Sequence, residues 1–302
     1  MENNNFLLVD GNLLLFQSFY ASAATNNTIM TDKNGNVTNA VHVFFSTLFK
    51  VLKEIRPSYL FIAFDASSKT KRHESFADYK AGRAKAPQEL YDQFDIVKNI
   101  LTQAKIPWLE KNGDEADDLI ATLCAHNKNT LNFIYSKDKD LLQLVNENTA
   151  ILKKNSGAKA YTEPFELITL GNFFSLYGIT PEQIPDFKGL AGDKSDNLRG
   201  INGIGDKGAI KLINDFGTLE NIYENLDKLS ATITKKLLAD KDSGFMCKEL
   251  GKLNKNVDIN TNKEQYLITQ INYEEGIKAF ECYNLNQNLS KFRDFFKSLA
   301  KK

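Results

Sequence analysis

The chain has 302 residues, of which 42% are hydrophobic and 25% charged, and its formal net charge is zero. This balance is typical of a folded, water-soluble protein and excludes a uniformly basic nucleic-acid binder, although local patches of either sign remain open. The three cysteines, Cys124, Cys247 and Cys282, form no C-x-x-C pair, so neither a disulfide framework nor a structural zinc site is expected. We expect no signal peptide and no membrane-spanning run, which favours the cytoplasm, and the length favours two domains.

Three short apolar runs, each followed by aspartate, are predicted to be buried strands. They are residues 6–9 before Asp10, residues 59–64 before Asp65, and residues 133–135 before Asp138 and Asp140. Helical patterns separate them, at about 13–23, at 38–55 and from 141 onward. This alternation predicts an α/β protein with a parallel sheet, whose carboxyl edge is the usual ligand edge. The aspartates are therefore expected to converge at that edge.

The stretch 113–120 puts four carboxylates into five positions, directly before an apolar helix pattern. They are Asp114, Glu115, Asp117 and Asp118. Negative charge is stabilised at a helix N-terminus, so an acidic first turn with no further role is the plainer interpretation. At about 100° per residue the last three acids point in different directions, so one ion is not expected to bind all of them. Together with the strand-end aspartates, this turn favours a metal-binding carboxylate cluster over unrelated helix caps.

Such a cluster requires cations, because two unit charges 4 Å apart repel by ~4 kcal/mol at an effective dielectric constant of ~20. All-oxygen ligands favour magnesium or manganese over zinc. The three histidines, His42, His73 and His126, show no H-x-x-x-H spacing. A pair of such ions activates water and stabilises the leaving oxygen of a phosphodiester.

Segment 66–87 interrupts the alternation of strands and helices with six basic residues against two acidic ones. The basic residues are Lys69, Lys71, Arg72, Lys80, Arg83 and Lys85. Phe76 and Tyr79 lie between them, and cations mixed with aromatic rings are typical of surfaces that bind single-stranded nucleic acid. A solvated loop is the alternative. Because the segment follows Asp65 directly, we expect it to rise over the carboxylate edge.

The second half of the chain changes character near Tyr161, after one more expected strand at about 149–153. Thr180 and Gln183, with Pro181 between them, have the spacing of a capping box and predict a helix start. Asp193 and Asp196 follow, and they share a face if this turn is helical.

Gly203 and Gly205 predict a tight hairpin that leaves backbone N–H groups bare at a helix N-terminus, with Lys207 and Lys211 adding positive charge. A helix–hairpin–helix that grips phosphate is the sharper interpretation, and an ordinary turn between helices is the plainer one. Further helices are expected at about 218–226 and 230–240, then a strand at 266–271 and two helices. The basic residues of the last helix, Lys291, Arg293 and Lys297 among them, are interpreted as a solvated face.

Over residues 5–260 the sequence resembles the bacterial and phage 5′-nuclease, or flap endonuclease, family, which includes the 5′→3′ exonuclease domain of DNA polymerase I. The motifs that carry the resemblance are Leu-Val-Asp-Gly at 8–11, Phe-Asp-Ala at 64–66, Arg-His-Glu at 72–74, Tyr-Lys-Ala-Gly-Arg at 79–83, Glu-Ala-Asp-Asp at 115–118, Asp-Lys-Asp at 138–140 and Gly-Asp-Lys-Ser-Asp-Asn at 192–197.

The resemblance implies a two-metal nuclease site containing magnesium or manganese. The first ion would be bound from among Asp10, Asp65, Glu115 and Asp117. The second would be served by Asp118, Asp138, Asp140, Asp193 and Asp196, some through water, and the division between the two ions stays open. Asp65 and Asp117 would thus be catalytic.

The same resemblance places Lys80 and Arg83 at the scissile phosphate, at the base of a helical arch through which the 5′ strand passes. Tyr79 would stack on a base near the cut, and Arg72 would contribute to DNA binding. The hairpin of Gly203 and Gly205, with Lys207 and Lys211, would hold the duplex, and family members can bind a potassium ion there through main-chain carbonyls.

The implied organisation is a PIN-like α/β domain over 1–170, with the arch at about 66–90, a helix–hairpin–helix domain over 171–262 and an extension over 263–302. The implied substrates are DNA with 5′ flaps or 5′ ends and RNA/DNA primer junctions in replication and repair. A monomer that works beside a DNA polymerase is expected, with no membrane partner.

Two departures and two alternatives accompany this hypothesis. Asp114 stands where the family usually has an aromatic residue, and no polymerase follows, so a stand-alone nuclease is expected. A non-catalytic DNA-binding protein with a decayed site is the main alternative, which the full set of acids disfavours. A phosphotransferase would require D-x-D after the first strand, where the sequence has Asp10-Gly11-Asn12.

Overall fold

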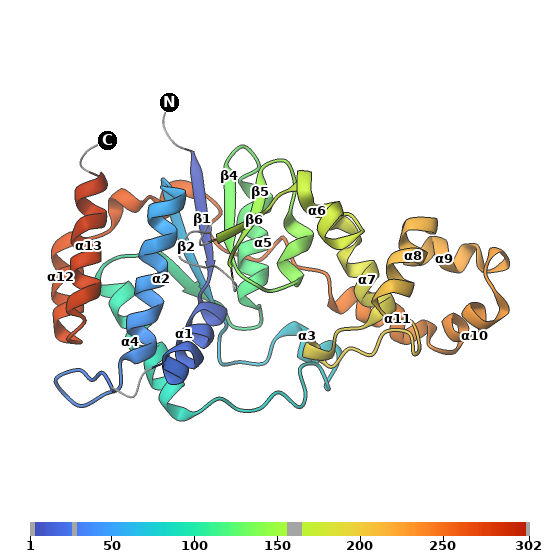
Figure 1. Ribbon diagram of the computed structural model, residues 1–302, viewed down its shortest axis with the longest axis horizontal. Coiled ribbons are helices and arrows are strands. Elements are labelled where there is room, and N and C mark those ends of the chain that lie inside the picture. The colour runs from blue at the N-terminus through green and yellow to red at the C-terminus, as the bar shows by residue number, and fades with distance from the viewer. Residues whose placement is uncertain (1–3, 26–28, 156–164, 300–302) are drawn as a thin grey trace.

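A computed structural model describes residues 4–25, 29–155 and 165–299. Six strands form one sheet in the order β3-β2-β1-β4-β5-β6 (Figure 1). Their bounds are β1 (Asn5–Asp10), β2 (Tyr59–Phe64), β3 (Trp108–Glu110), β4 (Leu131–Tyr135), β5 (Thr149–Lys154) and β6 (Phe165–Ile168). The first five run parallel, and β6 pairs antiparallel with β5. The predicted parallel sheet is confirmed, because the strands expected from the apolar runs occupy its centre.

Five helices lie on one face of the sheet. They are α1 (Gly11–Thr25), α2 (Asn39–Ile55), α4 (Gln88–Gln103), α12 (Tyr273–Cys282) and α13 (Asn286–Leu299). Buried side chains from Leu7 and Val9 of β1, Phe45 of α2, Phe280 of α12 and Phe292 of α13 belong to one apolar cluster on this face. Figure 1 shows α12 and α13, in red, beside α2. Helices α12 and α13 therefore lie outside the layer that α1, α2 and α4 form on the sheet, since α12 packs on α4 and α13 packs on α2.

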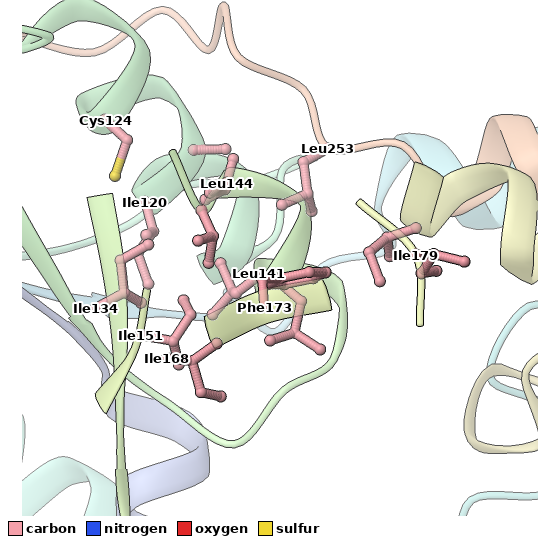
Figure 2. Packing of buried hydrophobic residues seen from close by; sticks show 14 of the residues in the cluster. Ile120, Cys124, Ile134, Leu141, Leu144, Ile151, Ile168, Phe173, Ile179 and Leu253 are labelled. Atoms are coloured by element: carbon pink, nitrogen blue, oxygen red, sulfur yellow. The ribbon is translucent and has the colours of Figure 1, made fainter. Parts of the chain in front are cut away.

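On the other face of the sheet, the apolar core includes side chains from the second half of the chain. Helix α5 (Ala116–His126) and the 3-10 helix Asp140–Leu144 lie against it. Figure 2 shows Ile120 of α5, Ile134 of β4 and Ile151 of β5 near Phe173 of α6 (Leu170–Tyr177), and Leu253 belongs to the same apolar cluster. A continuous apolar core thus connects the sheet to the helices of residues 170–250, called the helical lobe below.

The helical lobe contains six α-helices. Their bounds are α6 (Leu170–Tyr177), α7 (Ile184–Ala191), α8 (Asp206–Phe216), α9 (Leu219–Glu224), α10 (Ala231–Ala239) and α11 (Lys241–Leu250). The helices predicted at 218–226 and 230–240 correspond to α9 and α10. The predicted capping box is present, since the Thr180 backbone N–H donates to Gln183 Oε1 at 2.9 Å.

Three expectations about secondary structure need correction. The strand predicted at 266–271 is wrong: this segment holds 3-10 helices at Lys263–Tyr266 and Ile268–Gln270, and only Leu267 forms a bridge, to Tyr59. The helix expected from 141 is a 3-10 helix. The arch contains one short helix, α3 (Lys71–Ser75), which ends where the backbone becomes extended at Phe76; positive φ angles at Lys80 and Gly82 then turn the chain.

The change of character near Tyr161 lies outside the described residues. No helix in the described part of the chain has both the length and the apolar character needed to cross a bilayer.

Candidate active site

The ends of β1 and β4 are joined through Ser136. Asp10, the last residue of β1, accepts hydrogen bonds from the Leu13 backbone N–H and from Ser136 Oγ, both at 2.9 Å. The Asp138 backbone N–H donates to the same hydroxyl at 3.0 Å. Asp10 thus caps α1, as the plainer interpretation required, and also lies beside the end of β4.

Asp65, which follows β2, connects the sheet edge to α5. Its Oδ1 accepts from the Ala116 backbone N–H at 2.8 Å, and its Oδ2 accepts from Asn12 Nδ2 at 2.8 Å. A carboxylate at a helix N-terminus is stabilised by the free N–H groups there. The contact brings the acidic turn to the carboxyl edge of the sheet, as the sequence predicted.

One guanidinium group, that of Arg72, contacts three acids of the α5 turn. Arg72 Nη1 lies 3.0 Å from Glu115 Oε2, 2.8 Å from Asp118 Oδ2 and 3.7 Å from Asp117 Oδ1. Arg72 also donates to the carbonyls of Leu250 and Lys252, and its side chain is only 11% exposed. The acids that diverge around the helix therefore share one cation, and the arginine expected to contact DNA is buried among them.

Residues of the arch form ion pairs with one acid of this turn and with Asp196. Lys80 Nζ lies 2.9 Å from Glu115 Oε2, and Arg83 Nη2 lies 2.7 Å from Asp196 Oδ1. The Tyr79 hydroxyl donates to Glu115 and Asp196, each at 3.4 Å. Tyr79 is 2% exposed, so the ring expected to stack on a base is covered in this arrangement.

Lys188 is a site residue that sequence reasoning missed. It lies on α7, is buried, and forms ion pairs with Asp140, with Asp193 at 2.8 Å and with Asp196 at 3.8 Å. Asp193 caps the 3-10 helix Lys194–Asp196, which confirms that this turn is helical. A lone lysine in a mostly apolar helix was the available signal, but only the packing of α7 on the 3-10 helix at 140–144 shows which acids it meets.

Burial and mutual repulsion dominate the electrostatics of the strand ends. Burial, together with the charges of Asp138 and Asp65, raises the pKa of Asp10 to about 7, although the hydrogen bond from the Leu13 N–H opposes the increase. Burial likewise raises the pKa of Asp140 to about 7, although Lys188 opposes the increase. Against the effect of burial, Lys80 and Arg72 lower the pKa of Glu115. The ion pairs of Glu115 thus favour its ionised form, whereas burial disfavours the charge on Asp10, Asp117 and Asp140.

Asp114, the residue at the usual aromatic position, is neutralised outside this cluster. Its Oδ1 lies 2.7 Å from Lys71 Nζ, and the carboxylate is buried with only 4% of the side chain exposed. Its negative charge is therefore paired with α3 and adds little to the field at the strand ends.

The donor set fits a hard divalent cation. It consists of carboxylates, and Asp117 Oδ1 is buried without a hydrogen-bond partner among the described residues. Within these residues no three Asp, Glu, His or Cys side chains form a ready single-ion site. The reason is that the cations of Arg72, Lys80, Arg83 and Lys188 lie among the acids. The division of the acids between two ions stays a prediction.

The hairpin lies on the helical lobe, at the start of α8. Gly203 has φ +77°, as a tight turn requires, whereas Gly205 caps α8 with φ −96°. The hairpin is not bare: the Asn202 backbone N–H donates to Asp240 Oδ2 at 2.9 Å, and Lys236 Nζ donates to the Gly203 carbonyl at 2.8 Å. The first turn of α8 has no side-chain cap, and Lys207 and Lys211 on this helix are exposed.

Comparisons with known proteins agree with this architecture. Residues 5–169 match the family "5′-3′ exonuclease, N-terminal resolvase-like domain", and residues 179–274 match "5′-3′ exonuclease, C-terminal SAM fold". The chain is 35% identical over 301 residues to a 5′-3′ exonuclease of Mycoplasmopsis pulmonis, covering 98% of this chain and 96% of that one. It is 36% identical to DNA polymerase I of Bacillus subtilis, covering 96% of this chain but only 32% of the polymerase.

Among solved structures, a flap endonuclease of bacteriophage T5 in complex with DNA and metal ions has the same fold. The TM-score is 0.66 at 19% identity, with 96% of this chain and 98% of that chain covered. Two family matches that span most of the chain, together with a relative similar over its full length, lead to one conclusion. The chain belongs to the 5′-3′ exonuclease family and is a nuclease.

Proposed function

We propose that this nuclease hydrolyses phosphodiester bonds of DNA at 5′ ends and 5′ flaps, with magnesium held by the strand-edge carboxylates. The observation that carries the proposal is a set of contacts that link a strand end to two helical turns beneath the basic arch: Asp65 accepts from the Ala116 N–H, and the Tyr79 hydroxyl donates to Glu115 and Asp196. The related flap endonuclease of bacteriophage T5 was solved with DNA and metal ions, which supports DNA as the substrate.

Asp10, Asp65, Glu115 and Asp117 would hold one magnesium ion, with Asp118, Asp138, Asp140, Asp193 and Asp196 serving a second. Bound magnesium would supply positive charge for the leaving oxygen and lower the pKa of the attacking water. Lys80 and Arg83 would then leave their carboxylate partners and contact the scissile phosphate, where fixed cations stabilise developing negative charge. Tyr79 would become available to a base by the same movement.

The helical lobe would hold the duplex. The uncapped first turn of α8 offers backbone N–H groups to a phosphate, and Lys207 and Lys211 add two exposed charges on the same helix. The lobe and the acidic cluster would thus bind the two sides of a junction between duplex and single strand.

The cellular role would be removal of RNA primers and processing of flaps during replication and repair. Relatives that carry this region within DNA polymerase I support a polymerase as functional partner. We infer that the chain acts as a monomer in the cytoplasm.

The test is cleavage of a 5′-labelled flap substrate with and without magnesium, for the wild type and for Asp65→Asn. Cleavage should require magnesium and be lost in Asp65→Asn, with flap binding unchanged within a few-fold. Asparagine keeps an oxygen that can accept from the Ala116 N–H, so the start of α5 should persist. Asp92→Asn, an exposed acid on α4, is the matched control and should cleave normally.

Near-wild-type turnover of Asp65→Asn at saturating magnesium would contradict its role as a metal ligand. Binding of the flap by the wild type without any cleavage would instead favour the non-catalytic DNA-binding protein.

A further inference from the structure

Two side chains from the end of α10 grip the hairpin. Lys236 Nζ donates to the Gly203 carbonyl at 2.8 Å, and Asp240 Oδ2 accepts from the Asn202 backbone N–H at 2.9 Å. The two residues are four positions apart and therefore lie on one side of the helix. Adjacent polar groups of the hairpin, one acceptor and one donor, are thus matched by a cation and an anion.

The Lys236 contact is a close one. A Cβ added to Gly203 would meet Lys236 Nζ at 2.9 Å, so the ammonium group packs directly against the hairpin backbone. No ion pair within the described residues includes Lys236, so its charge is not neutralised by a carboxylate there. An ammonium group has three N–H donors, and the carbonyl uses one of them.

This arrangement does not fit the potassium ion that the resemblance implies at the hairpin. The Gly203 carbonyl is already bonded to an ammonium group, whose positive charge would repel a second cation bound to the same oxygen. We propose that Lys236 supplies the hairpin cation, so that duplex binding by this chain does not depend on potassium. The proposal rests on the proposed role of the hairpin in holding duplex DNA.

Lys236 is a positioning residue in this scheme, and its loss should be repaired by the ion it replaces. Lys236→Met removes the ammonium group and keeps the length of the side chain. At constant ionic strength in tetramethylammonium chloride without divalent ions, this variant should bind duplex about tenfold more weakly, as expected for a charged hydrogen bond. Exchange of tetramethylammonium for potassium should restore most of the affinity.

The experiment measures duplex binding by fluorescence anisotropy in both salts. The wild type and Lys236→Arg should show the same affinity in each salt. Lys235→Met removes an exposed lysine from the same helix and is the matched control, so it should lose little affinity and gain no preference for potassium. Thermal melting followed by circular dichroism confirms that each variant is folded.

A wild type that binds several-fold more tightly in potassium would overturn the proposal, whatever the folding of the variants. So would a Lys236→Met variant no weaker than Lys235→Met, or one whose loss potassium does not restore. A wild type that binds duplex in neither salt would contradict the proposed function of the hairpin itself.

Discussion

At residue scale, the acids of the α5 turn and those near Lys188 are paired with cations, whereas Asp10, Asp65 and Asp138 form no ion pair within the described residues. Arg72 serves the α5 turn, Lys188 serves Asp193 and its neighbours, and Lys80 and Arg83 reach down from the arch. Without such partners the acids would repel one another strongly in a partly buried site. The Lys80 and Arg83 side chains are more exposed than those of Arg72 and Lys188, and this difference separates their expected roles.

Arg72 is expected to act on stability. Its side chain is 11% exposed and bonds to two carboxylates and two carbonyls, so Arg72→Met would leave buried charges unpaired. The free energy of unfolding should fall by ~3–5 kcal/mol, measured by chemical denaturation in the presence of a chelator. Arg83→Met is the control: the Arg83 side chain is 53% exposed, and its loss should cost under ~1 kcal/mol. A stable Arg72→Met protein with weakened DNA binding would instead support the DNA contact implied by the resemblance.

Lys80 is expected to act on rate. The Lys80–Glu115 ion pair places the ammonium at the edge of the acidic cluster, where a single cation acts mainly on charge that develops during reaction. Lys80→Ala should lower the single-turnover cleavage rate about a hundredfold or more and change flap affinity only a few-fold. Lys85→Ala, which removes an exposed lysine of the same segment, should leave the rate near that of the wild type. An unchanged single-turnover cleavage rate for Lys80→Ala at saturating enzyme would contradict a role of Lys80 in the reaction.

At the scale of elements, the sequence was most informative where a pattern is local. The strand-end aspartates, the α2 helix and the capping box at Thr180 follow from short apolar runs and turn chemistry, and all are observed. Helix α4 is not among the predicted helices, although its apolar residues have helical spacing directly after the basic segment. The partners of Lys188 and Arg72 could not be predicted, because they depend on packing between residues more than 40 positions apart.

At segment 266–271 a local apolar pattern predicts the wrong element. Its apolar run is compatible with a strand, and β3 pairs only with Ile62–Phe64 of β2, but the segment forms just a single bridge, from Leu267 to Tyr59. The apolar side chains of Tyr266, Ile268 and Ile271 are buried from 3-10 turns instead.

Helix α8 is the element expected to set the salt dependence of duplex binding. Replacing both Lys207 and Lys211 with methionine should weaken binding and make the slope of log K against log salt shallower by ~1.8, since each phosphate contact contributes ~0.9. The matched control replaces Arg293 and Lys297 on α13, where each is already close to an acid, Glu281 and Asp294 respectively. An unchanged slope for the α8 variant, with a shallower slope for the control, would indicate that the duplex binds at α13 and not at α8.

At the scale of the whole molecule, segments far apart in the sequence pack side by side. The chain builds the sheet, leaves it to form the helical lobe, and returns with α12 and α13 to the face already covered by α2 and α4 (Figure 1). The described part of the segment expected as an extension, residues 263–299, therefore packs on the helices that cover the sheet. The polar contacts agree, since Asn288 of α13 donates to the His42 carbonyl and to Ser46 Oγ on α2.

Removal of residues 263–302 should therefore unfold the sheet domain. The deletion takes away Phe280 and Phe292, both fully buried, and uncovers Phe45 and Phe49, against which they pack. Each buried phenylalanine contributes ~3–5 kcal/mol by truncation to alanine, so two such losses approach the ~5–15 kcal/mol that stabilises a whole domain. Phe292→Ala in the full-length chain should alone lower the free energy of unfolding by ~3–5 kcal/mol, whereas Phe174→Ala, at an exposed position on α6, should change it by less than ~1 kcal/mol. A truncated protein that melts cooperatively near the wild-type temperature would show that the sheet and its remaining helices form a sufficient core without α12 and α13.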